Sequence, residues 1–270
     1  ETGKNISNQY LQDLYRFFKL SSFRSEFSDP FSSHIDIFQV SFLQSIFSDD
    51  NTLRLIGEFY FRKEYYAEAL TMFNKLLQNH RSDSELYQKI GYCLQMSGEY
   101  DKALDAYLKA EMIYPDSLWT LRRIASCYRT LKKPEAALEY YLRIEQMKPD
   151  NLSIEMNIGH CYFEQENYDE ALKYYFKVDY LDPKSTKAWR AIAWCSFLAG
   201  KQEQARRYYE KILNNKPTSI DYMNAGHIEF VLKNLNKTVE LYRKSIENDK
   251  GNKESFLNNF KQDIKYLIQA

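Results

Sequence analysis

The chain has 270 residues, of which 44 % are hydrophobic and 27 % charged, so it can bury a sizeable core and stay soluble. Its 37 lysine and arginine residues equal its 37 aspartate and glutamate residues, which argues against general binding of nucleic acid or of an anionic membrane. Apolar runs such as residues 191–200 fall far short of the roughly 18 residues that a membrane span needs.

Residues 1–49 make up the first predicted segment, a divergent helical N-terminal extension. It begins ETGKNISNQY, without an initiator methionine or a signal-like apolar stretch, so we expect a processed chain or a piece of a longer one. Two helices are expected at about 8–20 and 34–48, on either side of the loop-like SSFRSEFSDPFSS. Three interpretations stay open: a degenerate repeat, a lid over a groove, or a junction to an upstream domain.

Residues 50–251 repeat with a period of 34 residues, shortened once to 33, as stacked repeats do. Each of six copies has a small residue: Gly57, Gly91, Ala125, Gly159, Ala193 and Gly226. Twelve residues after it stands a second small residue: Ala69, Ala103, Ala137, Ala171, Ala205 and Thr238. Sixteen residues after it stands an aromatic residue: Phe73, Tyr107, Tyr141, Tyr175, Tyr209 and Tyr242.

Each copy is predicted to form a helix, a turn and a second helix. In DSELYQKIGYCLQMSGEYDKALDAYLKAEMIYPD, apolar residues lie three and four apart on both sides of a Ser-Gly break. In four copies a proline ends the second helix, and Asp, Ser or Thr nearby can cap the next one. The facing small residues allow the two helices to approach closely.

This pattern resembles the tetratricopeptide repeat family over about residues 50–250. The resemblance implies an all-α, right-handed superhelical solenoid of six units, and the residues outside the repeats add flanking helices and a C-terminal capping helix. The first helices would line a concave face, and the usual role is a peptide or protein binding scaffold. Some members clamp a C-terminal carboxylate with Asn directly after the small residue; no copy here has that Asn, so this clamp is not expected.

The four cysteines occupy one equivalent position in the second to fifth copies: Cys93, Cys127, Cys161 and Cys195. Equivalent positions on stacked helices lie about 8–10 Å apart, too far for a disulfide or for a single zinc ion. We therefore interpret them as small packing residues and expect neither a metal nor a cofactor. Unpaired thiols favour a reducing compartment, so a cytoplasmic location is predicted.

No pattern for catalysis is found, and we expect that the chain is not an enzyme. His160 and Cys161 are adjacent, but successive helical residues point about 100° apart and cannot act as base and nucleophile. Gly-rich phosphate loops, HExxH and GxSxG are missing from the sequence.

The candidate binding surface is a stripe on the first helices, three residues before the small position and one and four after it. Its centre is basic, and towards the C-terminus it becomes aromatic. The candidate residues are Tyr92, Trp119, Arg122, Arg129, His160, Phe163, Lys187, Arg190, Trp194 and Phe197. We expect a peptide with acidic or carboxylate groups against the arginines and an apolar anchor against the aromatics. The alternative is that the arginines solvate the groove and the aromatics pack between helices.

Residues 252–270 are predicted to form a capping helix that covers the last edge of the array. Its apolar face comprises Phe256, Phe260, Ile264, Leu267 and Ile268. Tyrosine pairs at 140–141, 174–175 and 208–209 place their second member in the core, and we expect the first to be partly buried in packing rather than to form a convex interaction patch.

We therefore predict a non-catalytic interaction scaffold that binds an unidentified peptide or protein on its concave face, as a monomer or weak homo-oligomer, without nucleic acid or a membrane span. Two other classes stay open. One is a regulatory module of a larger protein whose catalytic part lies outside this chain, and the other is a self-assembly module that uses its ends or its tyrosine-rich face.

Overall fold

The computed structural model describes residues 49–78 and 83–269, and in these ranges it consists of helices without a strand, which confirms the all-α class. The two helices expected before residue 49 lie outside the described residues. The helices are α3 (Asp50–Arg62), α4 (Tyr66–Gln78), α5 (Ser84–Met96), α6 (Tyr100–Ile113), α7 (Leu118–Thr130), α8 (Pro134–Met147), α9 (Leu152–Glu164), α10 (Tyr168–Leu181), α11 (Thr186–Leu198), α12 (Gln202–Leu213), α13 (Ser219–Val231), α14 (Leu235–Asn248) and α15 (Lys253–Gln269).

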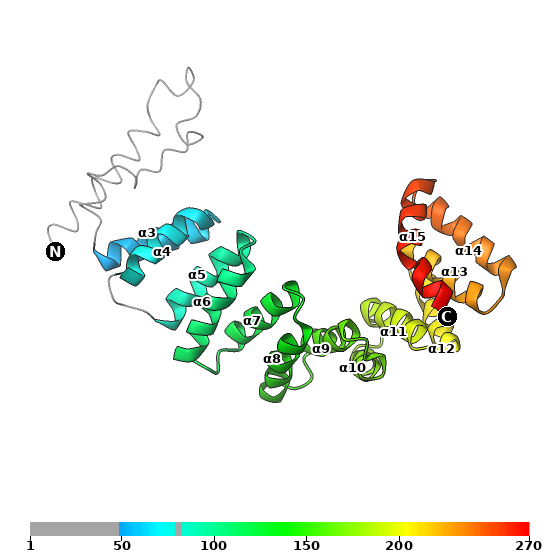
Figure 1. The fold of residues 1–270 in the computed structure, drawn as a ribbon, viewed down its shortest axis with the longest axis horizontal. Coiled ribbons are helices and arrows are strands. Elements are labelled where there is room, and N and C mark those ends of the chain that lie inside the picture. Colours follow the sequence, from blue (N-terminus) through cyan, green and yellow to red (C-terminus); the bar gives the residue numbers. More distant parts are fainter. Residues whose placement is uncertain (1–48, 79–82, 270) are drawn as a thin grey trace, which may run out of the picture.

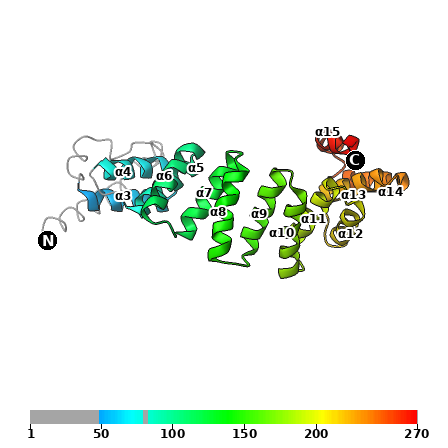
Figure 2. The ribbon, with the colours of Figure 1, turned by 60° about the horizontal axis from the view of Figure 1, so that its bottom comes forward.

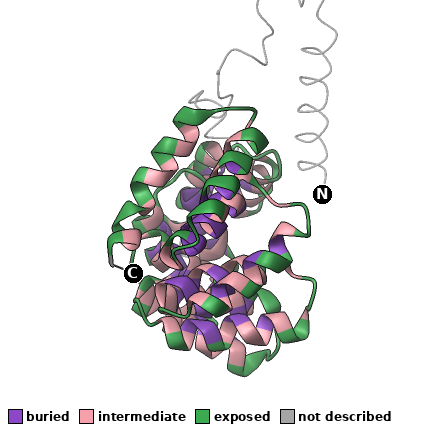
Figure 3. Ribbon diagram, turned by 90° about the vertical axis from the view of Figure 1, so that its right-hand side faces the viewer, coloured by how far each residue is buried: buried purple, intermediate pink, exposed green. Residues whose placement is uncertain are grey.

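Helices α3 to α14 pack as consecutive pairs, and each pair packs on the next to form an elongated solenoid (Figures 1 and 2). Buried residues follow the inside of these pairs, while the outer helix surfaces are exposed (Figure 3). Because contacts join mainly neighbouring helices, the core consists of successive clusters along the array rather than one central cluster. The count of six repeat units and the division into three domains stay predictions.

The same features recur at the ends of the helices in every pair. The first helix of every pair has a side-chain cap on its free amides: Asp49, Asp83, Ser117, Asn151, Ser185 and Thr218. The turn within every pair has one residue in the left-handed region: Glu64, Gly98, Lys132, Glu166, Gly200 and Lys233. Only two of these are glycine, so the other four turns hold a strained backbone that the packed helices must stabilise.

In the four pairs with glycine at the small position, the nearest side chain is the aromatic ring sixteen residues later, and not the second small residue that the sequence predicts to face it. A Cβ atom built on Gly91 would lie 2.6 Å from Cε1 of Tyr107, whose ring is completely buried. Tyr107 cannot easily retreat, because its hydroxyl donates to Oε1 of Gln95 at 2.9 Å and its ring packs on Trp119. A glycine is therefore required at residue 91 for the two helices to approach.

The cysteines Cys93, Cys127, Cys161 and Cys195 are buried and unpaired. Burial raises the pKa of each thiol, to about 11 for Cys127 and to about 12 for the other three. The thiols are thus protonated packing residues, in agreement with the interpretation from the sequence. Nowhere in the described part of the chain do three or more His, Cys, Asp or Glu residues gather to hold a metal ion.

The paired tyrosines have two separate structural roles. Tyr141, Tyr175 and Tyr209 are buried in the core. Their neighbours are partly buried, as predicted, and two of them join successive second helices: the Tyr140 hydroxyl donates to Glu111 at 2.9 Å, and the Tyr208 hydroxyl donates to Asp179 at 2.6 Å. These bonds tie α8 to α6 and α12 to α10. The third neighbour, Tyr174, stacks on Tyr162.

Helix α15 packs on α13 and α14 at the C-terminal end. Phe256 and Phe260 contact Tyr242, and Phe260 also contacts the buried ring of His227. Ile264 and Ile268 are exposed, however, so the five apolar residues predicted on one face do not all cover the array. The helix lies across the last pair, and that orientation buries one part of its apolar face and leaves the other open.

Candidate functional site

A cavity of about 420 Å³ lies between α7 and α9. We call it the α7–α9 groove. Helix α7 contributes Arg122, Ser126, Arg129 and Thr130, and α9 contributes Ser153, Ile154, Asn157 and Glu164; Lys132 and Tyr141 complete the lining. Of the ten candidate residues, the structure brings only Arg122 and Arg129 together in this groove.

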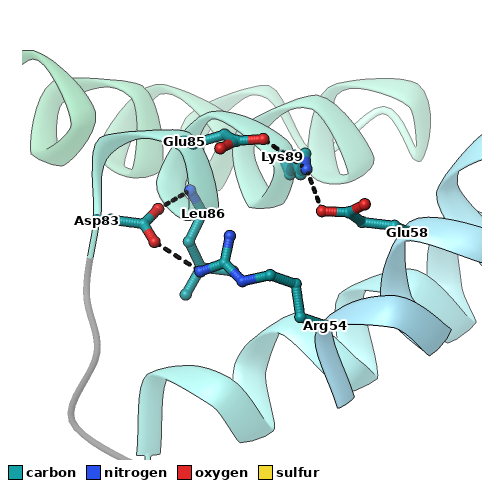
Figure 4. A network of polar contacts seen from close by, with 6 residues as sticks. All are labelled: Arg54, Glu58, Asp83, Glu85, Leu86 and Lys89. Carbon is teal, nitrogen blue, oxygen red and sulfur yellow. Dashed lines mark hydrogen bonds and ion pairs between the residues drawn. The ribbon is translucent and has the colours of Figure 1, made fainter. Parts of the chain in front are cut away.

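The position three residues before the small residue is occupied by a bonding side chain in several pairs. Arg54 donates to Asp83 at 2.6 Å, and Asp83 also accepts from the backbone N–H of Leu86, so the arginine supports the cap of α5 (Figure 4). Arg190 donates twice to Asp221 at the start of α13, at 2.8 Å from Nε and at 2.8 Å from Nη2. These two arginines join one repeat to the next.

Arg122 stands at the same position on α7 but lacks such a bond. At the start of α9, Asn151 stands at the N-cap position that Asp83 has at α5, and Ile154 stands at the position that Asp221 has at α13, so neither position presents a carboxylate. Among the described residues Arg122 has no ion-pair partner, and its side chain is exposed in the groove. Its positive charge is thus available to a ligand.

Arg129 lies one step further along the groove and is already paired. Its Nη2 donates to Oε1 of Glu164 at 2.8 Å, and its Nη1 donates to Oδ1 of Asn157 at 3.1 Å. Burial by itself would lower the pKa of this guanidinium, but the bond to Glu164 outweighs it and the pKa is raised. Arg129 thus lines the groove with a positive charge that Glu164 compensates.

The predicted aromatic anchor is mostly used in packing. Phe197 is only 2 % exposed and belongs to the core, so we leave it out of the binding surface. Trp194 packs between Phe197 and Tyr266 of α15, and Phe163 packs on Tyr168. These rings therefore contact residues of the protein itself.

Two further candidates lie away from the α7–α9 groove. Nδ1 of His160 is 2.9 Å from the hydroxyl of Tyr175, and burial, assisted by Arg129, lowers the pKa of the imidazole. The histidine is therefore neutral near pH 7 and supports the small–aromatic packing. Lys187 is exposed on α11 without an ion pair among the described residues.

Tyr92 and Trp119 form a stack with a residue that the sequence did not single out. The guanidinium of Arg123 lies 4.9 Å from the ring centre of Tyr92 and 5.0 Å from that of Trp119. Trp119 nevertheless remains 40 % exposed. Arg123 was missed because it lies outside the stripe, although its spacing of four residues from Trp119 on one helix is a signal for contact.

Stacked helix pairs with small–aromatic packing and a groove between first helices define a helical-repeat protein. Family models described as tetratricopeptide repeat match residues 56–117, 128–195 and 188–219, which together cover more than half of the chain. The chain belongs to the tetratricopeptide repeat family. Members of this family are in general non-catalytic proteins that bind protein partners.

Solved structures of MamA resemble the fold. One crystal structure of MamA has 19 % sequence identity and a TM-score of 0.57, and the match covers 61 % of this chain and 97 % of that one. MamA from Desulfovibrio magneticus RS-1 has 18 % identity and a TM-score of 0.57, with 61 % and 93 % covered. MamA MSR-1 has 18 % identity and a TM-score of 0.53, with 73 % and 98 % covered. At this identity the likeness concerns the fold alone.

Among curated protein sequences no relative matches the chain significantly. In residues 49–78 and 83–269, no helix combines the length and apolar character that crossing a membrane requires.

Proposed function

We propose that the chain is an interaction scaffold that binds a peptide segment in the α7–α9 groove, with an acidic or carboxylate group of the ligand against Arg122. The observation that supports this most is the comparison of equivalent arginines. Arg54 and Arg190 are bound by carboxylates of the next repeat, whereas Arg122 faces the groove without one. A charge-assisted hydrogen bond to a ligand carboxylate would use that charge.

The lining of the groove suits a peptide backbone. Ser126, Thr130, Ser153 and Asn157 present hydroxyl and amide groups that can both donate and accept hydrogen bonds. Arg129 and Glu164 already compensate each other, so the groove keeps two positive charges without an ion pair among the described residues, Arg122 and Lys132. The expected ligand is therefore a polar peptide segment with an acidic group, rather than a wholly apolar one.

The proposal is tested by purifying partners from native lysate on the wild-type chain, on Arg122→Glu and on Arg207→Glu, and identifying them by mass spectrometry. Arg207 is the matched control, because it is exposed on α12 and has no ion pair among the described residues. We expect partners that the wild type and Arg207→Glu retain and that Arg122→Glu loses at least tenfold. Equal recovery by all three folded chains would contradict the proposal.

Arg190 is unsuited to this test. Replacing it with glutamate would place two carboxylates together at the start of α13, so a loss of binding would report damage to the helix. Circular dichroism of Arg122→Glu should match the wild type, since no intramolecular ion pair is lost.

A further inference from the structure

Helix α7 carries an unusual concentration of uncompensated positive charge. Its sequence, LWTLRRIASCYRT, contains three arginines and no acidic residue. Arg129 is paired with Glu164, but Arg122 and Arg123 have no carboxylate partner among the described residues. The first half of α7 therefore attracts an anionic group.

The same half of α7 presents a fixed aromatic surface. The Arg123 guanidinium stacks on the rings of Tyr92 and Trp119, and the edge of Tyr107 supports Trp119 with a centroid distance of 5.8 Å. These contacts hold the indole in place while 40 % of the residue stays open to solvent. A rigid, half-exposed tryptophan is the kind of side chain that dominates binding at protein interfaces.

The spacing of the two features limits the ligand. Trp119 and Arg122 are three residues apart on α7, so they are neighbours on its surface, with roughly 5–6 Å between Cβ atoms. In an extended peptide, side chains two residues apart point the same way and lie about 6.6 Å apart. A cavity of about 420 Å³ accepts side chains of such a segment more readily than a helix about 10–12 Å across.

We infer that the partner is an extended peptide with an aromatic or large aliphatic residue two positions from an aspartate or glutamate. The apolar side chain lies on Trp119 and the carboxylate binds Arg122. This inference rests on the proposed function and names its ligand class. It also moves the apolar anchor from the C-terminal aromatics, which packing uses, to the N-terminal end of α7.

The test is selection of a displayed library of random 12-residue peptides on the full chain, with affinities of the enriched peptides measured by fluorescence polarisation. We expect enrichment of the apolar–x–acidic pattern. Trp119→Ala and Arg122→Gln should each weaken an enriched peptide about tenfold or more, while Trp119→Phe keeps most of the affinity. Arg122→Glu should instead favour the same peptide with lysine in place of its acidic residue.

Ser153→Trp distinguishes failure of the proposed ligand class from failure of the proposed groove, because the new side chain fills the α7–α9 groove from an exposed position on α9. If enriched peptides lose binding to Ser153→Trp but lack the apolar–x–acidic pattern, the ligand class is wrong and the groove proposal stands. If peptides bind all groove variants equally, or if no peptide is enriched, both are overturned. Lysine exchange that fails to restore binding to Arg122→Glu would also exclude the assigned ion pair.

Discussion

Single residues at equivalent positions of the array have different roles because their neighbours differ. Three residues before the small position, Arg54 and Arg190 form ion pairs with the next repeat, whereas Arg122 has no ion pair among the described residues. The small position also varies, since four copies have glycine there and two have alanine. Where glycine occurs, as at Gly91, the facing ring lies so close that a methyl group would collide with it.

Gly91→Ala is expected to destabilise the protein by about 2 kcal/mol. Alanine is the better helix former by about 1 kcal/mol, but overpacking a fixed, buried ring costs up to about 3 kcal/mol. Urea unfolding followed by circular dichroism measures the net effect. Ala125→Gly is the control, for which we expect a loss of about 1 kcal/mol from helix propensity alone. If Gly91→Ala were stabilising, the close approach would not matter energetically.

Three helix starts connect one repeat to the next, because α5, α7 and α13 each receive side-chain bonds from the preceding repeat. Asp221 does this most completely: it lies in a capping box with Thr218 and accepts two hydrogen bonds from Arg190. Burial by itself would raise the pKa of this carboxyl, yet the bonds from Arg190 and Thr218 hold the pKa below its usual value. Asp83 is instead the N-cap residue of α5; it also accepts from an arginine of the preceding repeat but is half exposed.

Asp221→Ala is therefore expected to cost about 3 kcal/mol of stability and Asp83→Ala about 1 kcal/mol. Removing the buried Asp221 leaves Arg190 uncompensated and breaks the capping box with Thr218, whereas Asp83 belongs to a more exposed pair that contributes little beyond its cap. The side-chain exposures of 4 % for Asp221 and 46 % for Asp83 set this order. Urea unfolding of both variants measures it, and equal losses would show that burial is not the cause.

For the whole molecule, the repeated burial of thiols makes the free energy of unfolding depend on pH. The four thiols sit at one equivalent position, and burial raises the pKa of all four from an ordinary value near 9 to about 11 or 12. A raised pKa means that the folded chain holds the proton more tightly than the unfolded chain. The stability that this provides is complete below about pH 9 and is lost as the pH rises towards 12.

We expect the urea midpoint to fall when the pH is raised from about 8 to about 10. Each thiol that ionises only in the unfolded chain lowers the free energy of unfolding by about 1.4 kcal/mol per pH unit above its unfolded pKa. A variant with all four cysteines changed to alanine is the control and should show a smaller fall, due to the buried tyrosines. A midpoint that does not change with pH in the wild type would contradict the burial of the thiols.

The repeat period was enough to predict the helix pairs, the buried small and aromatic residues, the caps and the packing role of the cysteines. These features depend on contacts inside a pair or with the next pair. Because the same residue types recur about every 34 residues, the local sequence pattern and the packing favour the same structure. The sequence thus placed the four cysteines correctly, as buried residues at one equivalent position of their helices.

The tertiary structure decided which of those positions are free. Arg122 and Arg190 look alike in sequence, and only the start of the following first helix shows that Arg190 is bound and Arg122 is not. Phe197 and Trp119 likewise differ in what their neighbours cover. The physical reason is that an element's own sequence sets which side chains share a face, whereas exposure and charge compensation come from a second element whose approach no local pattern encodes.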